Sequence, residues 1–424
     1  MVRLESILER DNLNKAMRQV IANKGSAGID GMEVAELRPY LMAHHPEITK
    51  AVREGKYKPS PVRRVQIPKE EWGKTRPLGI PTVIDRFIQQ AVAQRLSQAY
   101  EQWFSPNSHG FRPDRGCHTA INQALAYANR GKRWVVDLDL EKFFDTVNHA
   151  KLIQVLSERI KDGRVISLIH KMLRAPVSEK GKVTKTEIGT PQGGCVSPVL
   201  ANILLNELDQ ELDRRGHAFV RYADDMMVMC GSKKAAQRVY QSLRTFIEDK
   251  LKLKVNEQKS KICYINASEL KFLGYGFYID KEGVVKARVH QKSYEKCKRK
   301  LRELTSRSKG QSLDTYRERL NGFIRGWVNY FKLASMKSWV QETDQWLRRR
   351  IRQIYWKQWK TISMRSRALR QLGVSKEKAW EWANTRKAYW RVAGSHILST
   401  TLTNDFLKAR GWMCLKVVLR AVLR

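Results

Sequence analysis

The chain has 424 residues, 42% of them hydrophobic, and a formal net charge of +38 from 80 Lys and Arg against 42 Asp and Glu. This length favours two or three domains, and the charge favours a polyanionic partner, with nucleic acid ahead of an anionic membrane surface. There is no run of about 18 apolar residues and no signal-peptide core, so we expect a soluble, intracellular protein without a membrane partner.

The cysteines and the charges bear on compartment and domain organisation. The six cysteines include no C-x-x-C pair, which argues against a zinc site or a disulfide framework. Residues 291–424 hold 32 basic and 9 acidic residues and nine of the twelve tryptophans. This shift in composition predicts a domain boundary near residue 290.

The first 60 residues predict two helices around a glycine-rich loop. The first helix should run from Ser6 to Val20, and the loop covers residues 23–31. Its three glycines, Gly25, Gly28 and Gly31, indicate backbone with unusual dihedral angles or close approach to a ligand. A plain connector explains the loop equally well.

The segment from Pro59 to Pro81 predicts a β-hairpin that carries cations. Its first strand alternates in polarity, and a turn follows near residue 73. Arg63, Lys69 and Arg76 could clamp a triphosphate, because Arg and Lys bind phosphate oxygens and a hairpin can close over them. Alternatively, they are solvated edge charges that deter aggregation.

A strand with two carboxylates follows an amphipathic helix at 85–100 and another helix at 117–129. The strand covers residues 134–140, and its alternation puts Asp137 and Asp139 on one face. Charged residues on an otherwise apolar strand are costly unless they are paired or bind a metal. We therefore expect a site on that face.

Two adjacent carboxylates, Asp224 and Asp225, lie between the apolar runs of residues 220–230. This pattern predicts a tight β-hairpin with acid at its tip. Because neighbouring carboxylates repel, one interpretation is a divalent metal bound through oxygen ligands. The other is a solvated turn, in which Asp is common.

The order of the elements predicts the fold class. A glycine-rich turn at 189–194 opens a helix over 199–214; its free amides suit an anion or a base edge, although a simple turn and cap would suffice. A helix over 233–250 and a strand pair around 272–277 follow the acidic hairpin. Carboxylates from non-adjacent strands then suggest an α+β fold, an antiparallel sheet backed by helices, with a two-metal phosphoryl-transfer site.

With these motifs in this order, the chain resembles group II intron-encoded reverse transcriptases, or maturases, especially the short bacterial form. Tyr222-Ala223-Asp224-Asp225 resembles the family's Y-A-D-D box, Asp139 the metal ligand before Phe-Phe-Asp, and Thr190-Pro191-Gln192-Gly193 the P-Q-G motif of the nucleotide site. Ser108–Pro113 and Phe272–Gly274 also fit. The resemblance spans nearly the whole chain. It implies a right-hand polymerase fold, with fingers and palm followed by an α-helical thumb and a small basic C-terminal domain.

The resemblance also implies a role for each matched residue. Two Mg²⁺ ions, or Mn²⁺ in their place, would be held by Asp139, Asp224, Asp225 and the backbone oxygen of Leu140. Lys259 would protonate the departing pyrophosphate. The substrate-binding residues would be Arg63, Lys69, Arg76, Phe143, Gln192 and Tyr222. Phe143 would be the steric gate against a ribose 2′-hydroxyl, with Phe144 as the alternative, and the primer grip would be Phe272, Leu273 and Gly274.

Domains and partners follow from the same resemblance. The implied domains are an N-terminal extension with the start of the fingers (1–60), fingers and palm (61–290), thumb or maturase domain X (291–372) and a DNA-binding domain (373–424). The implied partners are group II intron RNA, an RNA template, a DNA primer, target DNA and deoxynucleoside triphosphates, in the bacterial cytoplasm as a ribonucleoprotein. The sequence has no zinc-bearing H-N-H endonuclease segment, so we do not expect it to cleave DNA.

Two other functions stay open. One is a splicing cofactor that only binds RNA, as when a catalytic box decays; the intact Asp139, Asp224 and Asp225 argue against it. The other is a relative recruited for host defence or repair, with the same chemistry and no intron. An intron catalytic core around the reading frame would decide for the maturase.

Overall fold

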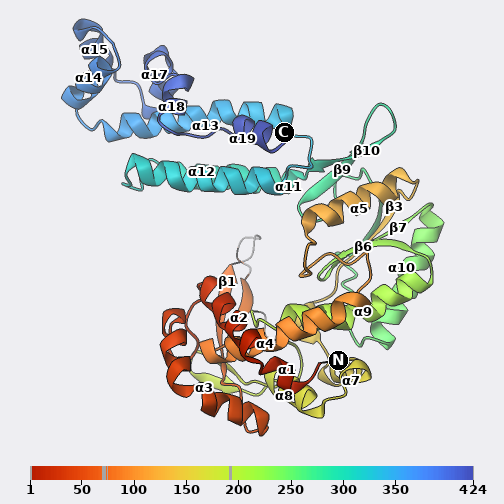
Figure 1. Cartoon of the computed structure of the whole chain (residues 1–424). Coiled ribbons are helices and arrows are strands. Elements are labelled where there is room, and N and C mark those ends of the chain that lie inside the picture. The colour runs from red at the N-terminus through yellow and green to blue at the C-terminus, as the bar shows by residue number, and fades with distance from the viewer. Residues whose placement is uncertain (1, 69–72, 74, 191–192, 424) are drawn as a thin grey trace. The chain divides into compact units, whose positions relative to one another are not determined.

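The computed structural model describes residues 2–68, 73, 75–190 and 193–423. The chain divides into two compact units, Met1–Ile265 and Asn266–Arg424 (Figure 1). The boundary predicted near residue 290 falls inside the second unit, because residues before it bond to the helical region after it. The Ser335 amide, for example, donates to the Ala287 carbonyl at 2.9 Å. The four predicted domain ranges stay predictions.

Helices form the N-terminal part of the first unit. They are α1 (Leu4–Ile7), α2 (Arg10–Ala22), η1 (Val34–Glu36), α3 (Leu37–Arg53), α4 (Val83–Tyr100) and η2 (Glu101–Trp103). The prediction of a single helix from Ser6 to Val20 is therefore wrong, since the helix is interrupted between α1 and α2. Arg95 of α4 occupies the break, where it donates to the Ser6 carbonyl at 2.9 Å and pairs with Glu9.

The predicted cationic hairpin is confirmed as part of a four-stranded sheet of order β2-β1-β4-β5. Its strands are β1 (Val62–Pro68), β2 (Thr75–Ile80), β4 (Val177–Glu179) and β5 (Lys182–Thr184). The antiparallel register of β1 and β2 pairs Arg63 with Ile80 and Ile67 with Arg76. Directly paired residues share a face of a sheet, so Arg63 and Arg76 lie on the same face.

A second four-stranded sheet, entirely antiparallel, has the order β6-β7-β3-β8. Its strands are β3 (Trp134–Leu138), β6 (Ala218–Tyr222), β7 (Asp225–Cys230) and β8 (Lys261–Tyr264). The acidic hairpin is confirmed as β6 and β7. The sequence predicts carboxylates on facing strands that are not adjacent along the chain; β3 and β7 are not consecutive in the chain and are neighbours in the sheet.

Helices complete the first unit and cover this sheet. They are α5 (Cys117–Asn129), α6 (Phe143–Thr146), α7 (His149–Arg159), α8 (Gly163–Leu173), α9 (Ser197–Arg214) and α10 (Lys233–Asp249). α5 and α9 contact β6, and α10 contacts β3, β7 and β8. Val136, Phe219 and Val228 of the sheet join Leu243 and Ile247 of α10 in the hydrophobic core.

The second unit contains one hairpin and the remaining helices. The hairpin is β9 (Tyr275–Ile279) with β10 (Val285–Val289). The helices are α11 (Gln291–Leu304), α12 (Leu313–Tyr330), α13 (Lys337–Gln358), α14 (Ile362–Gln371), α15 (Lys376–Ala383), α16 (Tyr389–Ala393), α17 (His396–Thr401), α18 (Asn404–Ala409) and α19 (Leu415–Val422).

Of the nine tryptophans of this unit, two are buried, six are half-buried and one is exposed. Trp356 is buried, and buried Trp412 donates from its indole nitrogen to the Tyr355 hydroxyl at 3.1 Å. Trp339 stacks on Tyr294 with ring centroids 4.3 Å apart, whereas Trp380 is exposed. Most of these aromatic rings therefore stabilise the helical unit.

None of the helices in the described ranges has both the length and the apolar character needed to cross a membrane.

Candidate active site

The acidic hairpin ends in a two-residue turn. Tyr222 pairs with Asp225, which leaves Ala223 and Asp224 in the loop. Ala223 has a φ of 56°, a conformation that costs energy for a residue with a Cβ atom. Gly110 allows the close approach of a neighbouring loop, because a Cβ atom on it would lie 2.4 Å from the Ala223 nitrogen. The turn is therefore held in a strained shape by its surroundings.

The strand register brings carboxylates from two strands together. β3 pairs with β7 up to Leu138 and Met226, so the next residues along the two strands are Asp139 and Asp225. Asp139 and Asp225 stand opposite each other across the two strands, and residues in opposite positions share a face of the sheet. This face also carries Asp137, which lies two residues before Asp139. The face assignment predicted from alternation is thus confirmed.

The backbone of Asp139 is fixed by the segment that follows α10. The Asp139 amide donates to the Ser260 hydroxyl at 3.0 Å, and its carbonyl accepts from the Asn256 amide at 2.9 Å. The same segment brings the Lys259 ammonium to 3.9 Å from the Asp139 carboxylate. A cation therefore stands beside the predicted metal ligands.

Burial raises the pKa of the Asp224 carboxyl above its ordinary value, while a backbone hydrogen bond and the charge of Arg221 oppose that rise. A half-buried carboxylate of this kind is stabilised by a cation that binds it directly.

The available donors fit a hard divalent cation, which prefers carboxylate and carbonyl oxygens. Leu140 pairs with Val255, and within the described ranges its carbonyl accepts no hydrogen bond. Among those residues, however, no group of three or more His, Cys, Asp or Glu side chains stands ready to hold a metal ion. The coordination would have to be completed by oxygens from the backbone, substrate or water.

The two candidate gate residues have different surroundings. Phe143 is 2% exposed and belongs to the hydrophobic core, whereas Phe144 lines a cavity of about 400 Å³. Arg64 and Gly79, which pair with each other across the hairpin, also line this cavity. They lie on the opposite face of the hairpin from Arg63 and Arg76.

The predicted triphosphate cations are only partly described. Arg76 is exposed on β2, and Lys69 lies outside the described residues, as does Gln192 of the P-Q-G motif. Arg63 is half-buried and donates to the Ala27 carbonyl of the glycine-rich loop at 2.7 Å. Arg63 therefore connects the hairpin to that loop.

Glycines explain the course of two loops near these residues. A Cβ atom on Gly28 would lie 2.6 Å from the Thr82 backbone, and one on Gly193 would lie 2.5 Å from the Gly79 carbonyl. Gly193 has a φ of 116°. Close backbone approach thus accounts for both glycines without a ligand.

The predicted primer grip forms a tight turn in the second unit. Phe272 and Tyr275 exchange backbone hydrogen bonds, and Leu273 and Gly274 both have positive φ, 50° and 82°. The Ser293 hydroxyl donates to the Gly274 carbonyl at 2.8 Å. The turn is anchored to the helices of its own unit.

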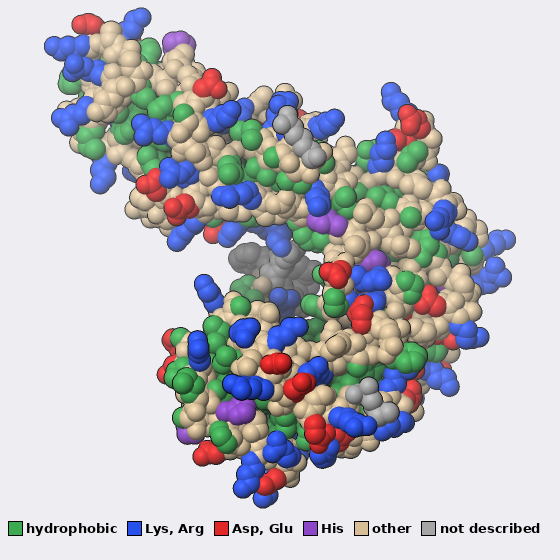
Figure 2. Space-filling view, viewed as in Figure 1, with side chains coloured by type: hydrophobic (Ala, Val, Ile, Leu, Met, Phe, Trp, Pro, Cys, Tyr) green, Lys and Arg blue, Asp and Glu red, His purple; other side chains and the backbone are tan. Residues whose placement is uncertain are grey.

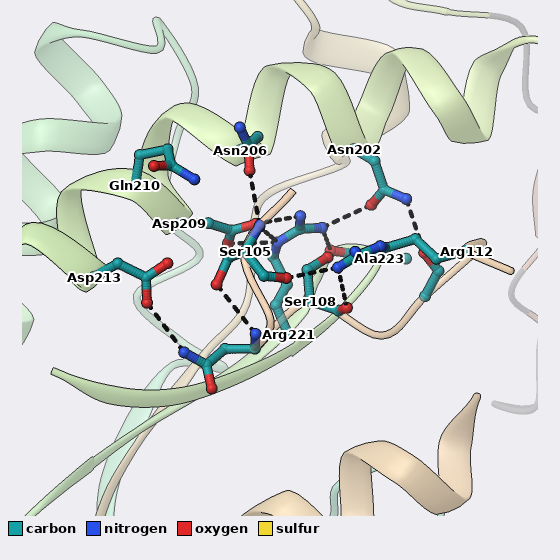
Figure 3. A network of polar contacts seen from close by, with 12 residues as sticks. Ser105, Ser108, Arg112, Asn202, Asn206, Asp209, Gln210, Asp213, Arg221 and Ala223 are labelled. Carbon is teal, nitrogen blue, oxygen red and sulfur yellow. Dashed lines mark hydrogen bonds and ion pairs between the residues drawn. The ribbon is translucent and has the colours of Figure 1, made fainter. Parts of the chain in front are cut away.

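Several residues that support the site were not predicted from the sequence. Asn256 and Ser260 fix Asp139, and the His149 ring lies 2.6 Å from the Gly189 carbonyl, next to the P-Q-G motif. A buried polar network around Arg221 lies behind the acidic turn (Figure 3). The Asn-x-x-x-Ser spacing before β8 was the only sequence signal, and it is weak.

Comparison with known proteins agrees with this architecture. Residues 67–277 match the family model described as reverse transcriptase (RNA-dependent DNA polymerase), and residues 294–373 match the group II intron, maturase-specific domain. The first unit, with its acidic turn beside β3, thus has the fold of a reverse transcriptase, and the predicted α+β polymerase fold is confirmed.

Similar proteins define the family of the chain more closely. Group II intron-encoded protein LtrA of Lactococcus lactis subsp. cremoris is 32% identical over 351 residues, which cover 66% of this chain and 57% of LtrA. Protein YkfC of Escherichia coli (strain K12) is 33% identical over 312 residues, or 64% of this chain and 81% of YkfC. A chain of a solved structure, the partial Cas6-RT-Cas1--Cas2 complex, aligns at 22% identity with a TM-score of 0.34. The aligned part covers 58% of this chain and 42% of the chain in the complex. The chain belongs to the group II intron reverse transcriptase and maturase family, and it spans 57% of the length of LtrA.

Proposed function

We propose that this chain is an RNA-directed DNA polymerase of a group II intron, which adds deoxynucleotides to a primer 3′ end and assists the folding and splicing of the intron RNA. The observation that carries the proposal is the register of β3 and β7. Their last pair, Leu138 and Met226, is followed along β3 by Asp139 and preceded along β7 by Asp225, and Asp224 lies in the adjoining turn. Family membership supports nucleic acids as the partners, and metal dependence is general in reverse transcriptases.

In this proposal the aspartates hold Mg²⁺, or Mn²⁺ in its place, with the Leu140 carbonyl as a further ligand. Two bound ions would lower the pKa of the primer 3′-hydroxyl and neutralise charge on the triphosphate. The hydroxyl would give its proton to solvent water as its oxygen bonds to the α-phosphorus and the bond to pyrophosphate breaks. Lys259, whose ammonium stands 3.9 Å from the Asp139 carboxylate, would give the leaving pyrophosphate a proton.

Other residues would position the substrates. Arg76 and Lys69 would bind the triphosphate, with Arg63 a weaker candidate since it already bonds to Ala27. Gln192 and Tyr222 would line the nucleotide pocket. The turn at Phe272–Gly274 would support the primer. Template RNA, target DNA and a cytoplasmic ribonucleoprotein are further parts of the same proposal.

Primer extension tests the proposed activity. Purified protein, an RNA template annealed to a DNA primer, the four deoxynucleoside triphosphates and Mg²⁺ should give full-length DNA. Folded protein that binds the duplex but extends no primer with either Mg²⁺ or Mn²⁺ would contradict the polymerase proposal and favour a splicing cofactor. An intron catalytic core around the gene would separate the maturase from a relative recruited for defence or repair.

The choice of sugar tests the gate. We expect Phe143→Ala to raise ribonucleotide incorporation relative to deoxynucleotide incorporation, because it removes an aromatic wall that excludes the 2′-hydroxyl. The measurement is the ratio of kcat/KM for the two nucleotides, which does not depend on the fraction of folded enzyme. This control matters because Phe143 is buried and its truncation also destabilises the fold.

Phe144→Ala is the matched variant. A change of sugar selectivity in Phe144→Ala alone would move the gate by one residue, to the side chain that lines the cavity. Unchanged selectivity in both variants would remove the gate from this segment.

A further inference from the structure

A buried ion pair lies on the face of the β6-β7-β3-β8 sheet opposite the aspartates. Arg221 precedes Tyr222 on β6, so its side chain points to the other face from Tyr222 and Asp225. That face is covered by α9, which supplies Asp209 (Figure 3). Arg221 is 1% exposed and Asp209 is fully buried.

The Arg221 guanidinium connects α9 to the acidic turn. Its Nε donates to the Asp209 carboxylate at 2.7 Å. One terminal nitrogen donates both to the Asn202 side-chain oxygen at 2.8 Å and to the Ala223 carbonyl at 3.0 Å, and the other donates to Asp209. The planar Arg221 guanidinium thus connects α9 to Ala223, the turn residue whose backbone is strained.

α9 also bonds to the loop at Gly110, which packs against the turn. The Asn202 amide nitrogen donates to the Gly110 carbonyl at 2.7 Å, and Gly110 is the residue without space for a Cβ atom beside Ala223. The Arg221 backbone is fixed as well, since its amide donates to the Asn107 carbonyl at 2.9 Å. The turn is therefore clamped from the helix and from the loop.

Stability alone does not account for this arrangement. A buried Arg–carboxylate pair must overcome the desolvation of both charges, and apolar residues of similar volume often fold as well or better. What apolar residues cannot supply is a directed donor to the Ala223 carbonyl. A strained residue persists only where its surroundings determine its geometry, and strain of this kind gathers at functional sites.

We propose that Arg221 and Asp209 are positioning residues, which set the geometry of the turn that carries Asp224 and Asp225 and thereby the affinity of the site for divalent metal. This inference rests on the proposed polymerase function. Neither residue is among the proposed metal ligands or substrate-binding residues. Groups that orient metal ligands from behind typically change metal affinity or activity by about 10–100-fold when they are altered.

Two variants test the proposal. Arg221→Lys keeps a charge opposite Asp209 but loses the fork, because a single ammonium cannot serve Asp209, Asn202 and Ala223 in the same directions. The double variant Arg221→Met with Asp209→Leu removes both buried charges together. The control double variant is Arg95→Met with Glu9→Leu. It removes another Arg–carboxylate pair whose guanidinium also holds a backbone carbonyl, but where α4 contacts the break between α1 and α2.

Metal binding and melting temperature are measured on the full chain without nucleic acid, with Mn²⁺ as the paramagnetic probe, and the Mg²⁺ dependence of primer extension is measured beside them. We expect Arg221→Lys and the double variant to weaken Mn²⁺ binding and to raise the half-saturating Mg²⁺ concentration by about tenfold or more. The control should change neither quantity, even at an equal loss of melting temperature.

The outcomes separate this inference from the proposed function. If Arg221→Lys binds Mn²⁺ and uses Mg²⁺ as the wild type does, Arg221 is only structural and the inference is overturned; this holds even if the double variant does not fold. If the control shows the same loss of Mn²⁺ binding as the test variants, general destabilisation explains it, which also overturns the inference. Failure of the wild type to extend a primer would instead reject the polymerase proposal.

Discussion

Asp224→Asn should abolish DNA synthesis while leaving RNA affinity close to that of the wild type. The change removes the charge of a proposed metal ligand from the half-buried turn but leaves the basic residues that would neutralise phosphates. Loss of one such group from a preorganised site should lower the rate of extension by at least about 10²–10³-fold. Single-turnover primer extension and a filter-binding titration with the same RNA duplex measure the two quantities.

Asp137→Asn is the matched control for this variant. Asp137 lies on the face of β3 that leads to Asp139. Burial raises the pKa of the Asp137 carboxyl to about 6, and its ion-pair partner is the Lys261 ammonium at 3.6 Å. Because Asp137 is not a proposed metal ligand, its replacement should leave most of the synthesis intact. Near wild-type extension by Asp224→Asn, or equal loss in both variants, would show that the proposed metal site is wrong.

The sequence was sufficient to predict that the strand carboxylates share one face, because this prediction depended only on the local alternation of residues. Alternation along residues 134–140 placed Asp137 and Asp139 together, and the apolar runs around Asp224 and Asp225 fixed a hairpin. The pairing of β3 with β7 depends on contacts about 90 residues apart in the chain, which no local pattern encodes. The family resemblance supplied that link.

Other features could not be predicted because tertiary contacts decide them. The break between α1 and α2 coincides with contacts from Arg95, a residue of another helix. β8 has only four residues, and it is a strand because it pairs with β3. Arg221 and Asp209 look like ordinary charged residues in the sequence, since only the folded chain shows that both are buried.

The basic C-terminal segment is the remaining functional assignment to test, and deleting it would not give a clear answer. A truncation after Leu372 removes Trp412, which is buried and bonded to Tyr355 of α13. It also removes the Leu415 amide, which donates to the buried Asp344 carboxylate at 2.8 Å. We expect such a truncation to destabilise the second unit, because Tyr355 and Asp344 would be left without these partners.

Neutralising surface charge avoids this problem. In Figure 2 the surface over α14 and α15 carries more Lys and Arg side chains than Asp and Glu side chains. Four of its exposed cations, suited to replacement by Gln, are Arg367, Arg370, Lys376 and Lys378. If they neutralise phosphates, replacing them should weaken DNA binding and reduce the slope of log K against log salt by about 0.9 for each phosphate that is no longer neutralised. Extension of a short annealed primer should survive, since the proposed metal and triphosphate residues lie in the first unit.

The control replaces the same number of exposed cations on or next to α10, namely Lys233, Lys234, Arg238 and Lys250. It changes the net charge equally, so a general effect of charge on association would appear in both variants. A smaller salt slope in the α14–α15 variant alone would place phosphate contacts on those helices. Equal salt slopes for that variant and the wild type, with both melting at the same temperature, would rule out a DNA-binding role for this surface and leave its charge to another anionic partner.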